Sequence, residues 1–275
     1  MMSLKIYQVD AFASEPFTGN PAAICLLEED NKKKDTLYDD QWMQLLAAEM
    51  NLSETAFVTK KEGNIYSLRW FTPTTEVKLC GHATLATAHI LWTETDLAAD
   101  KVVIFETLSG RLEVSNNNGL MTMNFPVETV TPLDSDNKYT AQINDILSCH
   151  CLGVYQTKED LLVEIDSEEA LEKLQPNIPL LATLPIRCLI VTAKSKKADL
   201  DFVSRVFGPA VGINEDPVTG SAHCSLTPFW ANKLNKNKLS ARQISKRGGN
   251  LSLQLLGNRV AISGTAITVL KGKLT

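Results

Sequence analysis

The chain has 275 residues, of which 44% are hydrophobic and 21% charged, and its net charge is -5. This composition is ordinary for a globular protein of one large or two medium domains. The acidic balance argues against nucleic acid as the main partner, because a phosphate backbone requires a concentrated basic surface. No apolar run approaches the roughly 20 residues that span a bilayer, and the N-terminus lacks a signal-peptide core. We therefore expect a cytoplasmic protein that acts without nucleic acid or membrane.

The first part of the chain predicts several strands and two helices. Alternating or continuous apolar residues predict strands over 4–10, 22–27, 53–58 and 68–71. A helix is expected from Asp39 or Asp40 to Asn51, and the polar loop over 28–35 should be exposed. A second helix, over 83–92, consists mainly of Ala, Thr and Leu with little charge on any side. Because a helix that is apolar all round is usually buried, strands should enclose this one.

The middle of the chain predicts an antiparallel meander and then a boundary. Strands are expected over 102–107, 111–115 and 120–125, separated by the turn signals Ser109-Gly110 and Asn118-Gly119. The polar, Pro-containing segment 126–140 follows. We therefore predict an N-terminal domain over 1–126 and a C-terminal domain over 127–275, whose last strand can pack back on the first domain.

The second half of the chain again predicts a mixture of strands and helices. Helices are expected near 140–150 and 167–174, and strands near 152–156, 161–165, 187–192, 251–255 and 260–262. A further helix from Ser221 towards Leu234 carries Pro228, which should kink or delay it. Strands dominate and each half has one buried helix, which predicts an α+β fold of two similar domains.

Two similar segments, 139 positions apart, carry the functional signal. They read Glu76-Val-Lys-Leu-Cys80-Gly81-His82-Ala83 and Glu215-Asp216-Pro217-Val218-Thr219-Gly220-Ser221-Ala222. Each has Gly where an extended segment turns into a helix, so backbone N–H groups at the new helix end can hold an anion. The N–H groups of Gly81, His82 and Ala83, facing those of Gly220, Ser221 and Ala222, suit a small carboxylate-bearing molecule between the two halves. No Gly-rich nucleotide fingerprint is present, so neither dinucleotide nor ATP chemistry is expected.

The titratable groups on and near these segments are the candidates for chemistry. The segments carry Cys80, His82, Glu215, Asp216 and His223, and Glu54 lies nearby at a predicted helix-to-strand junction. A carboxyl group in an enclosed apolar site can act as acid and base in turn near neutral pH. From its residue type alone, capping a loop or pairing with a surface cation would be the commoner role for Glu54.

Neither cysteine nor histidine spacing predicts a metal site. The six cysteines show no framework spacing, which indicates reduced thiols. Cys149-His150-Cys151 lacks further ligands, as does the pair His82 and His89, which share a helix face. We therefore expect neither a metal nor another cofactor.

Several motifs in the same order resemble the phenazine-biosynthesis PhzF-like proteins. They are Tyr7-Gln-Val-Asp10-Ala-Phe12, Phe17-Thr-Gly19-Asn20-Pro21-Ala22, Asn51-Leu-Ser-Glu54-Thr55, Cys80-Gly81-His82-Ala83-Thr84, Asp216-Pro217-Val218-Thr219-Gly220-Ser221-Ala222 and Arg247-Gly248-Gly249. The resemblance implies a diaminopimelate-epimerase-like fold, in which two pseudo-symmetric domains each form a strand barrel around a central helix. The site would lie in the cleft between the domains, and a homodimer would be the assembled form.

The same resemblance implies a cofactor-independent isomerase that moves a proton between carbons of a small carboxylate-bearing metabolite. Glu54 would be the acid/base, with His82 and Asp216 as further catalytic residues. The residues expected to bind substrate are Gly81, Ala83, Gly220, Ser221, Ala222, Thr219 and Asn20.

Two alternatives stay open from the sequence. Related epimerases use two cysteines, one at each helix end. Cys80 matches the cysteine of the first helix end, but Thr219 stands at the position of the other cysteine. A threonine hydroxyl is a much weaker acid than a thiol. An amino-acid epimerase is therefore the second enzyme hypothesis, and Cys80 is interpreted as a packing residue. The chain could also be a binding or scaffold protein without turnover.

Overall fold

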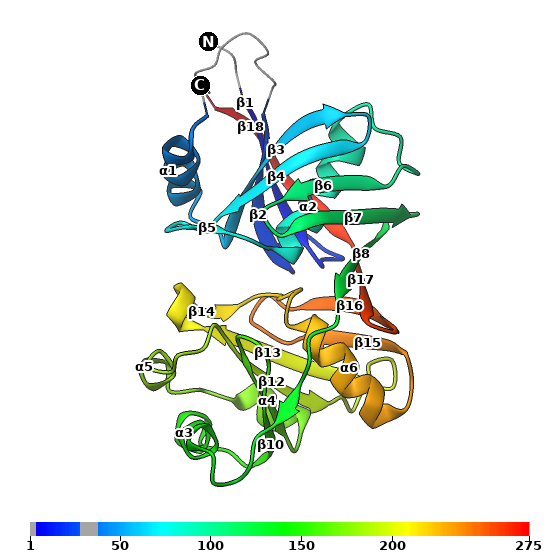
Figure 1. Ribbon diagram of the computed structural model, residues 1–275. Coiled ribbons are helices and arrows are strands. Elements are labelled where there is room, and N and C mark those ends of the chain that lie inside the picture. Colours follow the sequence, from blue (N-terminus) through cyan, green and yellow to red (C-terminus); the bar gives the residue numbers. More distant parts are fainter. Residues whose placement is uncertain (1–3, 28–37, 275) are drawn as a thin grey trace. The chain divides into compact units, whose positions relative to one another are not determined.

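The computed structural model describes residues 4–27 and 38–274, in two compact units (Figure 1). The first unit comprises Met1–Asn124 with Ser263–Thr275, and the second comprises Phe125–Ile262. The C-terminal strand is therefore part of the first unit. The loop that the sequence predicts to be exposed, 28–35, lies outside the described residues. None of the described helices is long and apolar enough to span a membrane.

The first unit is built on one strongly connected sheet. Its neighbouring strands, in spatial order, are β18 (Ala266–Leu274), β1 (Leu4–Ala11), β2 (Asn20–Leu27), β3 (Glu54–Glu62), β4 (Ile65–Phe71), β6 (Val103–Thr107), β7 (Gly110–Asn117) and β8 (Leu120–Pro126). β2 and β3 are parallel, as are β4 and β6, and the other neighbours in this order are antiparallel. The predicted meander is thus confirmed as β6, β7 and β8. A short strand, β5 (Glu76–Val77), pairs with β4 and leads to the first glycine motif.

Helix α2 (Gly81–Glu94) forms the centre of this unit. It packs against β1, β2, β3 and β18, and its residues Gly81 to Ala88 are all buried (Figure 1). The hydroxyls of Thr84 and Thr87 donate to backbone carbonyls one turn earlier, which satisfies these polar groups inside the apolar core. The expectation of a helix enclosed by strands is confirmed.

Helix α1 (Asp40–Met50) covers an outer face of the same unit. Asp39 caps its N-terminus by accepting the N–H of Trp42, and Asn51 ends it in a left-handed conformation, with φ of 50°. Its apolar side packs on a cluster that includes Phe57 and Phe71. The predicted helix boundaries are therefore confirmed at both ends.

The second unit repeats the topology of the first. Its strands follow the order β9 (Thr131–Pro132), β10 (Cys151–Gln156), β11 (Leu161–Ile165), β12 (Leu189–Lys194), β13 (Phe202–Gly208), β15 (Lys238–Gln243), β16 (Gly249–Leu256) and β17 (Arg259–Gly264), with β14 (Ile213–Asp216) beside β13. From β10 to β16 the pairings alternate antiparallel, parallel, antiparallel, parallel, antiparallel, as they do from β1 to β7. The outer helices are α3 (Lys138–Leu147), α4 (Glu168–Lys173) and α5 (Ile178–Leu181).

An arginine–glutamate pair marks the equivalent place in both units. In the first, Arg69 on β4 donates two N–H groups to Glu76 and lies over the ring of Phe71. In the second, Arg205 on β13 donates two N–H groups to Glu215 in the same way. Glu215, a candidate titratable group from the sequence, is therefore the structural partner of a buried arginine.

The core helix of the second unit, α6 (His223–Leu234), corrects one expectation. It begins at His223 rather than Ser221 and continues through Pro228 without interruption. Proline lacks the N–H that would bond the carbonyl of Cys224 in an α-helix. That carbonyl instead accepts the N–H of Glu128, at 3.0 Å, so the orphaned acceptor is satisfied from outside the helix.

Candidate active site

Three of the expected site residues, Asn20, Glu54 and His82, meet with Cys80 at one edge of the first unit. β2 and β3 are parallel and begin at the same edge, where Ala22 is in register with Glu54. Asn20, the first residue of β2, therefore lies near Glu54, the first residue of β3. Helix α2 also begins at this edge, because Asn20 contacts His82 in its first turn. The glycine turn before α2 thus brings Cys80 and His82 to the start of the two parallel strands.

His82 lies at the centre of this cluster. Its Nε2 is 3.2 Å from Oε2 of Glu54, and the side chains of these residues are only 6% and 12% exposed. On the other side of the ring, Nδ1 is 3.2 Å from Nδ2 of Asn20 and 3.5 Å from Sγ of Cys80. Asn20 is fully buried. The imidazole therefore links the carboxylate of Glu54 to a buried amide and a thiol.

Burial decides the charge of His82. Removal from water lowers the pKa of His82 to about 3. The ring is consequently neutral at physiological pH, and its contact with Glu54 joins a neutral imidazole to a carboxyl group rather than forming an ion pair.

The N-terminal end of α2 offers backbone donors beside these side chains. Within the described part of the chain, no side chain caps this end, and the first intrahelical bond runs from Thr84 N to Cys80 O. The N–H groups of Gly81, His82 and Ala83 precede that bond and have no helical acceptor. Together with the helix dipole, they favour a bound anion by about 0.3–1 kcal/mol at exposed ends and more where the site is enclosed.

The same cluster contains residue types that can bind a metal ion. Ligand atoms of Glu54, Cys80 and His82 all lie within 4.8 Å of one another. However, Glu54 approaches Nε2 of the imidazole whereas Cys80 approaches Nδ1. The two ring nitrogens point in opposite directions, so one ion cannot take both contacts, and the arrangement is that of a proton-relay or hydrogen-bond chain.

In the second unit, Asp216 and Thr219 belong to a compact polar network. The hydroxyl of Thr219 donates to a carboxylate oxygen of Asp216. Gln243 on β15 accepts the N–H of Thr219 at 2.9 Å and donates to the backbone carbonyl of Asp216 at 2.7 Å. The Gln243 amide therefore fixes the turn that carries Asp216. Its role was not predicted, because Gln243 lies on a strand that the sequence analysis missed.

Ser221 has a charged partner that sequence reasoning missed. Arg187 donates to Oγ of Ser221 at 3.1 Å, and the rest of its guanidinium is held in a fork by the buried carboxylate of Asp160. The N–H of Cys188 also donates to Asp160, at 3.1 Å. Because the arginine donates to the serine oxygen, the hydroxyl proton of Ser221 is available for another acceptor. Arg187 and Ser221 are 34 positions apart, and no local pattern connects them.

His223 and Cys224, at the start of α6, are both core residues. His223 is fully buried, its Nδ1 lies 2.8 Å from the carbonyl of Thr219, and its ring stacks on Phe202. Burial lowers the pKa of His223 to about 4 and raises the pKa of Cys224 to about 12. Both groups are neutral members of the core.

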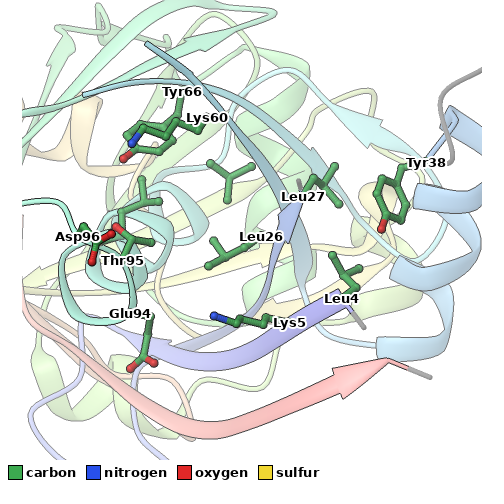
Figure 2. A pocket seen from close by; sticks show the side chains of 12 residues that line it. Leu4, Lys5, Leu26, Leu27, Tyr38, Lys60, Tyr66, Glu94, Thr95 and Asp96 are labelled. Atoms are coloured by element: carbon green, nitrogen blue, oxygen red, sulfur yellow. The ribbon is translucent and has the colours of Figure 1, made fainter. Parts of the chain in front are cut away.

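A cavity of about 410 Å³ opens at the opposite end of α2 (Figure 2). Glu94, the last residue of α2, lines it together with Lys5 on β1 and Lys60 on β3. Leu26 and Tyr66 contribute apolar surface. A helix of this length spans about 20 Å, so this cavity is remote from Glu54, and none of the expected site residues lines it.

Comparisons with known proteins also indicate an isomerase. A family model described as phenazine biosynthesis-like protein matches residues 9–272. An uncharacterized isomerase of Halalkalibacterium halodurans is 50% identical over 274 residues, which is 100% of this chain and 99% of that protein. A crystal structure of a PhzF-family phenazine biosynthesis protein from Enterococcus faecalis has a TM-score of 0.90 at 41% identity and covers 100% of both chains. A hydroxyproline epimerase from Agrobacterium vitis shares the fold, with a TM-score of 0.61 at 11% identity over 100% of this chain and 91% of that one.

Proposed function

Because the chain belongs to the phenazine biosynthesis-like, or PhzF-like, isomerase family, we propose that it moves a proton between carbons of a small carboxylate-bearing metabolite, with Glu54 as the acid/base. One observation carries this proposal. The nearly buried carboxyl group of Glu54 lies 3.2 Å from a neutral imidazole, at the uncapped end of the core helix α2. A proton-transfer group and an anion-binding end are thus side by side.

The proposed reaction conserves its proton. The substrate carboxylate binds the N–H groups of Gly81, His82 and Ala83, which places a neighbouring C–H bond at Glu54. Glu54 takes the proton, the electron pair of that bond spreads into the unsaturated substrate, and the N–H groups stabilise the negative charge. Glu54 then returns a proton, either the same one or one exchanged with solvent, to a different carbon, so that no cofactor and no redox partner is consumed. Positioned acid–base groups of this kind contribute rate factors of about 10²–10⁴.

In the second unit, Asp216, Thr219, Gly220, Ser221 and Ala222 are proposed to contribute to catalysis and substrate binding as the sequence predicts. Ser221 is the best supported of these, because Arg187 occupies its acceptor side and leaves its hydroxyl proton for a ligand. A homodimer and a cytoplasmic location stay predictions from the sequence.

Two-thiol epimerisation has less support. It requires a second acidic thiol in the other unit, but Thr219 stands at the aligned position and its hydroxyl donates to Asp216. The thiols of Cys188 and Cys224 in that unit are buried, and burial raises the pKa of each to about 12. Neither is a ready acid or base at neutral pH.

The proposal is tested by incubating the protein in heavy water with a panel of small cyclic, unsaturated and amino carboxylates. Deuterium bound to carbon is read by mass spectrometry, isomeric products are read by chromatography, and ligand binding is read by thermal shift. Label or isomer formation by one compound supports the isomerase. A compound that raises the melting temperature without label or isomer would instead support the binding protein without turnover.

A further inference from the structure

His82 is held between two partners that impose different requirements on its two nitrogens. A neutral imidazole carries one proton, so one nitrogen donates and the other accepts. Nδ1 faces the amide nitrogen of Asn20 at 3.2 Å, and Nε2 faces the carboxyl group of Glu54 at 3.2 Å. The choice of tautomer therefore decides what His82 presents to the proposed acid/base.

The surroundings of Nδ1 consist of donors. The amide nitrogen of Asn20 has N–H groups and no lone pair for hydrogen bonding, so it can only donate. The thiol of Cys80, 3.5 Å away, is a weak donor as well. A proton on Nδ1 would therefore point at an N–H group, whereas a lone pair there accepts from it.

The surroundings of Nε2 require the complementary arrangement. A lone pair on Nε2 would face a carboxylate oxygen of Glu54 and repel it, whereas an N–H group there attracts it. Among the described residues, Nε2 has no aligned hydrogen-bond partner, so its contact with Glu54 is close but off the N–H direction. A small ring rotation, or a polar group of a bound substrate, completes the bond.

We propose that Asn20 is a positioning residue that fixes His82 as the Nε2–H tautomer, so that His82 presents a proton donor to Glu54. Asn20 suits this role because it is fully buried and begins β2, the strand directly paired with β3 at Glu54. The sequence predicts Asn20 as a substrate-binding residue, and this inference gives it a different task. The functional meaning of the tautomer rests on the proposed role of Glu54. The presence of the Nε2–H tautomer does not depend on that role.

The tautomer is measured by long-range ¹H–¹⁵N NMR on protein labelled at histidine, between pH 6 and pH 8. Single substitutions by Gln assign the signals of His82, His89, His150 and His223. For His82 we expect a protonated Nε2 and an unprotonated Nδ1, without titration over this range. A wild-type His82 that carries its proton on Nδ1, or that titrates near its ordinary pKa, overturns the inference, and this result needs no variant to fold.

Two variants then assign the cause. Asn20→Asp replaces the donating amide by an acceptor of the same shape, so the proton should move to Nδ1 or the ring should become charged. Cys80→Ala is the matched control, which removes the other neighbour of Nδ1 and should leave the tautomer unchanged. If the tautomer changes in Cys80→Ala, or persists in a folded Asn20→Asp, then Asn20 is not the positioning residue.

Activity separates this inference from the proposed function. Asn20→Asp should lower the rate of label incorporation by about 10²-fold or more, because the proton is then on the wrong nitrogen. An Nε2–H tautomer that depends on Asn20, in a protein that transfers no proton, would retain the inference and reject the isomerase. Proton transfer that Asn20→Asp leaves intact would retain the isomerase and reject the inference about Asn20.

Discussion

The buried histidines predict a specific loss of stability in mild acid. Burial lowers the pKa of His82 to about 3 and that of His223 to about 4, from an ordinary value of 6.5. Well above pH 6.5 both are neutral in the folded and unfolded chain and contribute no pH dependence. Below it, the unfolded chain binds two protons that the folded chain does not, so the free energy of unfolding falls as the pH falls.

The size of this effect follows from the linkage relation. Each unmatched proton removes about 1.4 kcal/mol per pH unit once the unfolded histidine is fully protonated. Between pH 7 and pH 5 the two histidines together should remove about 4 kcal/mol. This is a large part of the roughly 5–15 kcal/mol that stabilises a typical domain. Unperturbed carboxylates titrate mainly below this window, so they add little to the slope.

The assay is urea unfolding at half-unit steps from pH 7.5 to pH 5, followed by tryptophan fluorescence. His82→Gln and His223→Gln should each remove about half of the slope, whatever their effect on stability at pH 7.5. His150→Gln is the matched control, because His150 is exposed, and it should leave the slope unchanged. A flat stability profile in the wild type, or a full slope in the variant that carries both His82→Gln and His223→Gln, would refute the reasoning.

Three further predictions concern single residues. Arg205→Met should destabilise the protein by about 3–5 kcal/mol in urea unfolding, because it leaves a carboxylate and two backbone carbonyls without their buried donor. Lys61→Met, in an exposed ion pair, should have a far smaller effect, and an equal loss of stability in the two variants would contradict this prediction. Gly19→Ala should lower the melting temperature, since φ is +66° and a Cβ atom would lie 2.2 Å from a backbone oxygen; an unchanged melting temperature would show that the turn relaxes. Cys80→Ala should leave Glu54-dependent label incorporation largely intact, and a loss as large as that of Glu54→Gln would reveal a catalytic thiol.

The features that the sequence predicted well are those that depend on local residue patterns. Helix α2 was predictable because it is apolar on every side, and the meander was predictable from its glycine turn signals. Strand β15 was missed because its buried positions include Ala241 and Gln243, which hardly register as hydrophobic, while Lys238 and Arg242 dominate the pattern.

Long-range partners account for most of what the sequence did not predict. The fork between Arg187 and Asp160, which supports Ser221, joins segments with no shared local signal. The carbonyl that Pro228 leaves unbonded is satisfied by Glu128, far away in the chain, so a local rule about proline overestimated the disruption of α6. The contact between the Asn20 amide and His82 was not predicted, because only the pairing of β2 with β3 determines where that amide lies. Substrate binding by Asn20 stays a prediction.

The central claim is that Glu54 carries a proton from one carbon of the substrate to another. Its most direct test is the position of deuterium in the product after turnover in heavy water, compared between wild type, Glu54→Gln and Glu62→Gln. Glu62 is the matched control, because it lies exposed at the far end of the same strand, β3. The account predicts product isomer in wild type and Glu62→Gln, with deuterium at the newly formed C–H bond in every turnover in which the Glu54 proton exchanges with solvent, and neither label nor product in folded Glu54→Gln. Product that forms at the wild-type rate in Glu54→Gln would contradict it.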